Sequence, residues 1–382
     1  MKRRLLSLFG ILSVLILSNT DTAYAQITIS GDARVRPRWD INDRTGNNQN
    51  LTRDVYVMYR ARVNMTADIG DGWSFNSLFG HNGVGEYAGK FSRGELPDIL
   101  GVEQSNISND AARRATVDFM LLNIAYKHHL GGFKLGLFAL GAVSNPVYDL
   151  HYYPARMVDI PYFIFNNDGI YGFSGYRNFN EGNTKLEAAL YVDDDRGEFI
   201  KNSDGEVLQN NDDQYTLELG LNHKTAGINW RLQSLYTLAA DSIAKPITIS
   251  LQSSGWQLGK TRVDGQVMYS NQRTDNPVSN QGHFGLPMNS YDAWFFRITT
   301  IRKFGSDRLR VWWDLSNRID HLETGDMARQ FHHIWAEYAI QLAKTDHGRI
   351  VLIPRIRQQL VQDDGVQRQL RHKIEMDLDI FF

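Results

Sequence analysis

The sequence contains no cysteine among its 382 residues. Disulfides, metal–thiolate sites and catalysis by a cysteine nucleophile are therefore excluded. Long apolar runs are also scarce: residues 5–17 form one, but a membrane-spanning helix needs about 20 such residues. No phosphate-binding glycine loop with the right spacing and no G-x-S-x-G nucleophile motif occurs. We therefore expect no metal, no cofactor and no enzymatic activity.

The N-terminal segment has the pattern of an export signal. Three basic residues at 2–4 precede the apolar run, and an Ala-Tyr-Ala sequence follows at 23–25. A basic start, a short apolar core and an A-x-A site predict a secretory signal peptide that is removed after residue 25. We expect residues 26–382 to form one mature domain.

The net charge of that domain argues against nucleic acid as a partner. Residues 1–25 hold three of the 41 Lys and Arg and one of the 43 Asp and Glu, which leaves 38 basic and 42 acidic residues and a net charge of −4. No overall positive field is available to attract a nucleic acid.

Alternation of apolar and polar residues, the pattern of β-strands, fills most of residues 26–382. It is most regular in the last ten residues, KIEMDLDIFF, where even positions from 374 to 382 are apolar and odd positions from 373 to 379 are charged. The pattern predicts sixteen strands, at 26–39, 53–69, 73–82, 115–127, 132–142, 168–178, 184–193, 213–224, 228–238, 246–254, 261–270, 292–303, 307–318, 331–343, 349–360 and 368–382.

The connections between the expected strands alternate in length. Tight turns are expected around 70–72, 130–132, 225–227, 304–306 and 345–348, and longer loops at 40–52, 83–114, 143–167, 194–212, 271–291 and 319–330. Two connections fit less well, because 239–245 is short for a loop and 255–260 is long for a turn. Short periplasmic turns, long extracellular loops and an even strand number are typical of a bacterial outer-membrane barrel.

Alternation alone also suits a soluble β-sandwich, which would bury its apolar face. The export signal, the loop pattern and the aromatic residues near strand ends together favour a membrane barrel, in which aromatic girdles lie at the interfaces. These aromatic residues are Trp39, Trp73, Tyr126, Phe133, Tyr215, Trp230, Trp294 and Phe296. We predict an all-β, antiparallel up-and-down β-barrel of about sixteen strands in the outer membrane of a Gram-negative bacterium, wide enough for a water-filled channel.

If the apolar face meets lipid, the other face of each strand lines a lumen that is rich in arginine. Closing the barrel places the last strand beside the first, so the cations of the first two and of the thirteenth, fifteenth and sixteenth strands form one basic wall. The predicted pore-lining, anion-binding residues are Arg34, Arg36, Arg38, Arg60, Arg62, Arg308, Arg310, Arg355, Arg357 and Arg371.

Two interpretations of the basic wall remain open. Acids that project into the same lumen would neutralise part of it through interior salt bridges. These acids are Asp32, Asp314, Glu337, Glu375, Asp377 and Asp379. Alternatively, the guanidinium groups attract anionic solutes, whose carboxylates or phosphates match their planar fork. The centre of the wall is expected to have more cations than local acids, at Arg34, Arg36, Arg60, Arg62, Arg355 and Arg357.

A long loop is expected to narrow the channel. Residues 143–167 are unusually aromatic and proline-rich for a solvated loop. If they fold inward, they place five side chains in the pore, whereas packing at the rim would leave it open. The five are Tyr148, His151, Tyr152, Tyr153 and Tyr162. Loop 83–114 is the other candidate.

Several stretches resemble a known family. ISGDARVRPRWD, YRARVNMTADIGDGW and ATVDFMLLNIAYKHHLGGFKLG are similar to hairpins of bacterial outer-membrane porins, most of all those of the alginate-export group. The resemblance implies a barrel of eighteen strands with a cationic lumen for an acidic polysaccharide. The sequence departs from that group in its count of sixteen strands and in LFALGAVSN, which lacks the polar strand expected there.

The sequence thus predicts a porin-like channel for anionic solutes or an acidic polysaccharide. The alternatives are an alginate-type exporter conduit that needs a periplasmic partner, and a non-conducting barrel that acts as an enzyme or adhesin. An enzyme would use Asp314 or Asp320 with His321, His332 or His333. Expected partners are outer-membrane lipid, lipopolysaccharide and the barrel-insertion machinery. The terminal Phe382 resembles the end signal that outer-membrane barrels offer to this machinery. The chain would be a homotrimer or a monomer.

Overall fold

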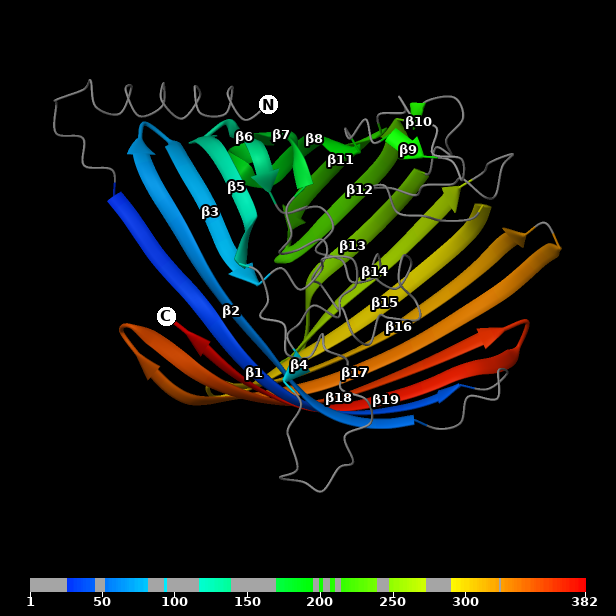
Figure 1. Ribbon diagram of the computed structural model, residues 1–382. Helices are drawn as coiled ribbons and strands as arrows, with labels where there is room; N and C mark the ends of the chain where they lie inside the picture. The colour runs from blue at the N-terminus through cyan, green and yellow to red at the C-terminus, as the bar shows by residue number, and fades with distance from the viewer. Residues whose placement is uncertain are drawn as a thin grey trace.

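The chain folds as a closed antiparallel up-and-down β-barrel in the computed structural model (Figure 1). The structure describes residues 26–44, 52–81, 93–94, 117–138, 170–194, 199–201, 207–209, 214–238, 247–272, 290–322 and 324–382. Nineteen strands are present in these residues, and all but three of them belong to the barrel wall, which therefore has sixteen strands. The predicted fold class is confirmed.

The barrel strands are β1 (Gln26–Arg44), β2 (Thr52–Gly70), β3 (Trp73–His81), β5 (Val117–His128), β6 (Gly131–Phe138), β7 (Ile170–Phe179), β8 (Thr184–Asp194), β11 (Gln214–Thr225), β12 (Ile228–Leu238), β13 (Ile247–Leu258), β14 (Thr261–Gln272), β15 (Ser290–Phe304), β16 (Asp307–Leu322), β17 (Gly325–Thr345), β18 (Gly348–Asp363) and β19 (Val366–Phe381). The short β4 (Arg93–Gly94) pairs with β2, and β9 (Phe199–Lys201) pairs with β10 (Val207–Gln209). A 3-10 turn, η2 (Asn180–Gly182), joins β7 to β8. No helix among the described residues is long and apolar enough to cross a membrane.

Each barrel strand pairs with its neighbours in the sequence, and the ring closes where β19 pairs with β1. Figure 1 shows this seam as the meeting of the blue first strand with the red last strand. Closure matters because an open sheet edge would expose unpaired N–H and C=O groups in the membrane.

Short turns at one end of the barrel need left-handed backbone. At the β11–β12 turn, Ala226 has φ 49° and Gly227 has φ 78°, a pair of positive φ values that suits a two-residue hairpin. The β15–β16 turn has Gly305 at φ 63°. The glycine-containing tight turns expected at 225–227 and 304–306 are therefore present.

Two of the expected connections are wrong. Residues 319–330 are not a long loop, because β16 continues to Leu322 and β17 starts at Gly325. The polar residues there form pairs within the hairpin. Asp320 pairs with Arg318 and Arg329 on the inner face, and His321 pairs with Asp326 on the outer face. Residues 255–260 are also mostly strand, since β13 runs to Leu258 and a bulge between Ser253 and Trp256 absorbs Gly255.

The two faces of the barrel differ as the alternation predicts. On β19, Ile374 and Met376 are 46% and 50% exposed on the outside, whereas the inward Lys373 and Asp377 are fully buried. Aromatic side chains cluster on the outside near the strand ends, as in the contact of Trp73 with Tyr126, whose ring centroids lie 5.1 Å apart. An apolar outer band with aromatic clusters suits contact with lipid and its interfaces.

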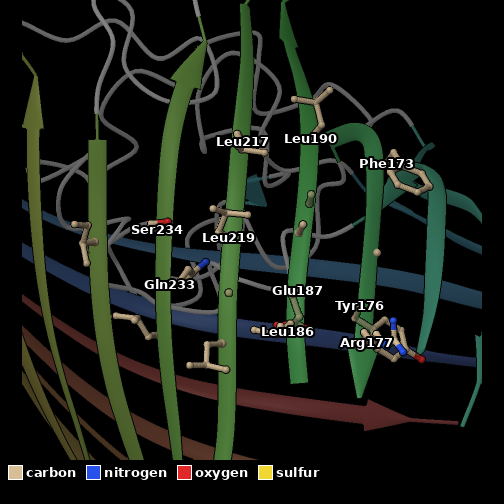
Figure 2. Close-up of a pocket in the computed structure, with 17 residues that line it drawn as sticks. Phe173, Tyr176, Arg177, Leu186, Glu187, Leu190, Leu217, Leu219, Gln233 and Ser234 are labelled. Atoms are coloured by element: carbon tan, nitrogen blue, oxygen red, sulfur yellow. The ribbon is translucent and has the colours of Figure 1, made fainter. Parts of the chain in front are cut away.

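A groove of about 820 Å³ is part of this outer surface (Figure 2). It lies over β7, β8, β11, β12 and β13, and most of its lining is apolar. In Figure 2, Leu190 on β8 and Leu217 and Leu219 on β11 lie along it. These residues have the outward parity of their strands, so the groove faces lipid and not the lumen.

The seam leaves no room for a side chain at Gly31. The Gly31 N–H donates to the Phe382 carbonyl oxygen at 2.7 Å, and the Phe382 N–H donates to the Gly31 carbonyl oxygen at 3.1 Å. A Cβ at Gly31 would lie 2.5 Å from the carbonyl oxygen of Arg62 and 2.6 Å from the Phe382 ring. We predict that Gly31→Val lowers the free energy of unfolding by about 2 kcal/mol, because the backbone has to shift. Urea unfolding in lipid vesicles measures this change.

The matched control is Ala33→Val, at the next outward position of β1. It adds methyl groups on the lipid face and should change the stability by less than about 1 kcal/mol. Equal stability losses in the two variants would contradict a tight seam at Gly31.

Candidate functional site: the charged lumen wall

The inward faces of β15 to β19, β1 and β2 form one surface of alternating cations and carboxylates, called here the charged wall. Closure brings the start and the end of the chain into register, with Arg34 opposite Asp379 and Arg38 opposite Glu375. The backbone pairing of β18 with β19 places Arg355 opposite Glu375. Residues far apart in the sequence therefore share one charged surface.

Three arginines of β1 pair with three acids of β19 across the seam. Arg34 holds Asp379 with two hydrogen bonds of 2.5 and 2.6 Å. Arg36 holds Asp377 in the same bidentate way at 2.5 and 2.8 Å. Arg38 pairs with Glu375. Such fork-to-fork contacts fix geometry as well as charge.

The network continues along the strands on either side of the seam. Arg355 bridges Asp377 at 2.8 Å and Glu337 at 3.0 Å, and Arg357 lies 2.5 Å from Glu375. Glu337 also takes Arg310 at 2.6 Å and Arg308 at 3.7 Å. On the β2 side Arg62 lies 2.6 Å from Asp32, and further along the seam Asp40 takes Arg371 at 2.5 Å and Lys373 at 3.0 Å.

These ion pairs join ten cations to six carboxylates, an excess of four positive charges in this set. Four of the carboxylates, Glu337, Glu375, Asp377 and Asp40, are each shared by two or more cations. The wall is therefore paired and still positive.

Burial divides these cations into two groups. The side chains of Arg36, Arg38 and Arg357 are at most 4% exposed, whereas Arg308 and Arg310 are 44% and 27% exposed. Arg34 and Arg62 are intermediate, at 17% and 13%. A solute in water reaches Arg308 and Arg310 most readily and does not reach the buried Arg36, Arg38 and Arg357. The expectation of a cation-rich, accessible centre is corrected for Arg36, Arg355 and Arg357, because the acids of β19 and Glu337 cover them.

Two tryptophans point into the same wall, and one contacts a buried arginine and the other an exposed one. Trp312 and Trp335 stack with ring centroids 4.3 Å apart. Arg357 lies over the Trp335 ring at 3.7 Å and Arg310 over the Trp312 ring at 4.7 Å. These rings are not among the predicted pore-lining residues, although alternation could have placed them there: Trp312 shares the parity of Arg310 and Asp314, and Trp335 shares that of Glu337.

Other predicted residues are placed differently. Arg60 lies opposite Arg34 in the backbone register, but its side chain is outside the described set. The loop residues Tyr148, His151, Tyr152, Tyr153 and Tyr162 also lie outside the described residues, as do loop 143–167 and all of loop 83–114 except 93–94.

Of the predicted histidine–aspartate combinations, the described residues pair His333 with Asp314, whereas His321 pairs instead with Asp292 at 3.0 Å and Asp326 at 2.7 Å. His333 Nδ1 lies 3.2 Å from Asp314 Oδ2, and both side chains are completely buried. Arg297 also pairs with Asp314. His332 lies on the other face of the strand, stacked on Trp313 at 6.3 Å.

Sequence reasoning missed a second group of cations on the inward faces of β6, β8 and β12. These are Lys134, Lys185 and Arg231. Lys134 and Arg231 are each the one charged residue of their strand, and Lys185 is followed two residues later by Glu187, so no local run of cations marks the group. Only the register of five consecutive strands shows that they belong to one part of the lumen.

We predict that Asp377→Asn destabilises the barrel by about 3 kcal/mol or more, because it leaves buried arginines without their shared charge. Urea unfolding of the protein in lipid vesicles tests this. The control is Arg262→Gln, whose side chain is 46% exposed in its pair with Asp264, and for which a loss of less than about 1 kcal/mol is expected. Equal effects of the two changes would contradict a structural role for the seam.

No protein-family model matches the chain, and no curated protein matches it. Solved outer-membrane structures are similar. The anion-selective porin from Comamonas acidovorans has a TM-score of 0.54 and 12% identity, covering 93% of this chain and 99% of that chain. The outer membrane channel DcaP of Acinetobacter baumannii has a TM-score of 0.53 and 9% identity, with 94% and 99% covered.

The outer-membrane expressed OmpT of Vibrio cholerae is a further likeness, at a TM-score of 0.52 and 10% identity, with 94% of this chain and 99% of that chain covered. At such low identity these likenesses show the fold, a porin-type barrel. The alginate-export resemblance stays a prediction. The predicted localisation, the outer membrane of a Gram-negative bacterium, is confirmed.

Proposed function

We propose that this barrel is a channel that passes anionic solutes through its lumen and that it is not an enzyme. The observation that carries the proposal is the group of arginines around Glu337. Arg308 and Arg310 are exposed to water and share this one carboxylate with Arg355. Three cations on one acid give a local positive charge where a solute can reach it.

The chemistry of these groups sets the class of solute. Guanidinium groups bind carboxylates and phosphates through paired N–H donors. Rings and rows of fixed charge in a pore raise the local concentration of counter-ions. The four excess positive charges of the charged wall act in the same direction. The likeness to a porin that is named anion-selective agrees with this proposal and does not carry it.

An acidic polysaccharide is the second candidate solute, on the strength of the sequence resemblance to alginate exporters. It would meet the same exposed arginines as small anions. The two differ in size, so a polymer of uronic acid residues would block the current carried by chloride for as long as it occupies the pore. In either case lipid and lipopolysaccharide surround the barrel, and Phe382 is the proposed signal for the insertion machinery.

The experiment is a planar-bilayer recording of the intact protein in a gradient of potassium chloride. The reversal potential of the unmodified protein should show that chloride is preferred over potassium. In Arg308→Gln with Arg310→Gln, the permeability ratio should fall at least about tenfold, because each unit charge at contact distance in water is worth about 1 kcal/mol, or about fivefold.

Arg302→Gln is the matched control, because Arg302 lies on the outside of β15 over the Phe304 ring at 5.2 Å. It should leave the permeability ratio unchanged. The proposal is wrong if the folded protein does not conduct, or if its reversal potential shows a preference for potassium over chloride. Adding oligomers of a uronic acid to the same bilayer distinguishes polymer from small solute.

A further inference from the structure

The wall opposite the seam carries a compact group of cations around Glu187. Lys185 pairs with one oxygen of Glu187, and Arg231 reaches the other at 3.4 Å. Asn222 donates to the same oxygen as Arg231, at 2.7 Å. Lys185 Nζ also lies 4.3 Å from the centroid of the Tyr176 ring. Figure 2 shows that Tyr176 and Glu187 come from the neighbouring strands β7 and β8.

Gly220 makes this contact possible. The register of β8, β11 and β12 places Gly220 between Glu187 and Gln233, so Arg231 has to reach across β11 to meet Glu187. A Cβ at Gly220 would lie 3.5 Å from Glu187 Oε2, which shows that the carboxylate lies over the glycine. A larger side chain at 220 would separate Arg231 from Glu187.

The group has more cations than acids. Lys134 on β6 and Lys127 on β5 share this inward face, because the register places Lys134 opposite Ser174 and sets Lys127 in line with Gly132 and Tyr176. The second acid nearby, Glu218, is 4% exposed and accepts a 2.6 Å hydrogen bond from the Tyr191 hydroxyl. The four cations Lys127, Lys134, Lys185 and Arg231 therefore share this face with two carboxylates, one of them buried.

Water reaches this group. The side chains of Lys185, Glu187 and Arg231 are 35%, 21% and 17% exposed, in contrast to the fully buried Arg357 of the charged wall. Lys185 and Arg231 are held in place by Glu187 and are still open to water. They can therefore release the Glu187 carboxylate and bind an oxyanion of a solute instead.

The position of the group also matches the exposed arginines of the charged wall. In a ring of sixteen strands, strands eight apart face each other, so β6 faces β16 and β12 faces β1. Lys134 therefore lies on a strand that faces the one carrying Arg308 and Arg310, and Arg231 lies on a strand that faces the one carrying Arg34. Arg308, Lys185 and Arg231 each come within four residues of a short turn, at the same end of the barrel.

We propose that Lys134, Lys185 and Arg231, grouped around Glu187, form a second oxyanion site at the short-turn end of the lumen. The site binds carboxylate or phosphate groups of solutes that enter or leave the lumen at this end. It lies on the side of the lumen that faces the exposed arginines of the charged wall. The inference rests on the proposed anion channel and assigns a binding step to residues outside the charged wall. Glu187 acts as the internal competitor that a solute displaces.

The test is a titration with inorganic phosphate added to chloride-conducting single channels in a planar bilayer. Phosphate that pauses at the site lowers the chloride current, and the half-blocking concentration measures its affinity. In Lys134→Gln with Lys185→Gln, this concentration should rise at least tenfold, since each lost contact charge corresponds to about fivefold. In Glu187→Gln it should fall about fivefold, because the competing carboxylate is gone.

Arg177→Gln is the matched control, because Arg177 is an exposed cation on the outside of β7, over the Phe179 ring at 5.5 Å. It should leave the half-blocking concentration unchanged. The opposite signs expected for the lysine and glutamate changes separate a binding role from damage to the fold, which would shift both variants in one direction.

Unchanged half-blocking concentrations in the lysine and glutamate variants of an anion-selective channel would overturn the second site and leave the proposed function standing. An unmodified protein that prefers potassium would overturn both. Should the double lysine variant fail to fold, Arg231→Gln and Glu187→Gln alone give the same pair of opposite predictions.

Discussion

Ion pairing between the inner faces of β1 and β19 is the interaction on which the rest of the barrel depends. Arg34, Arg36 and Arg38 meet Asp379, Asp377 and Glu375 there, from opposite ends of the chain. The seam needs such help, because Pro37 has no N–H to donate to a neighbouring strand. Charges this deeply buried are tolerated only in pairs, so the acids of KIEMDLDIFF and the arginines of β1 require one another.

That pairing also determines which cations are left to act on a solute. Acids are concentrated at the seam, and the arginines beside them are buried against the Trp312–Trp335 stack or against carboxylates. Away from the seam, single carboxylates such as Glu337 and Glu187 each hold two or more cations that remain partly exposed. The lumen therefore combines a rigid, neutralised seam with accessible positive groups on facing walls.

The strands could be predicted from the sequence because lipid on one side and charge on the other enforce a period of two along almost every strand. The hairpin at 319–330 could not, since its polar residues look like a loop until their partners across the hairpin are known. The ion pairs were only partly predictable. Arg36 and Asp377 are far apart in the sequence, and closure alone brings them together. The contact of Arg231 with Glu187 depends on Gly220 and on the register of three strands, which no local pattern encodes.

The most direct test of this division between structural and accessible cations uses the unmodified protein. Arginine-specific labelling with phenylglyoxal, followed by peptide mass spectrometry, measures the modification rate of each arginine in the folded barrel. The account predicts fast modification of Arg308 and Arg310 and protection of Arg36, Arg38 and Arg357, whose side chains are at most 4% exposed. Equal rates for the two groups, or faster labelling at the seam, would contradict it.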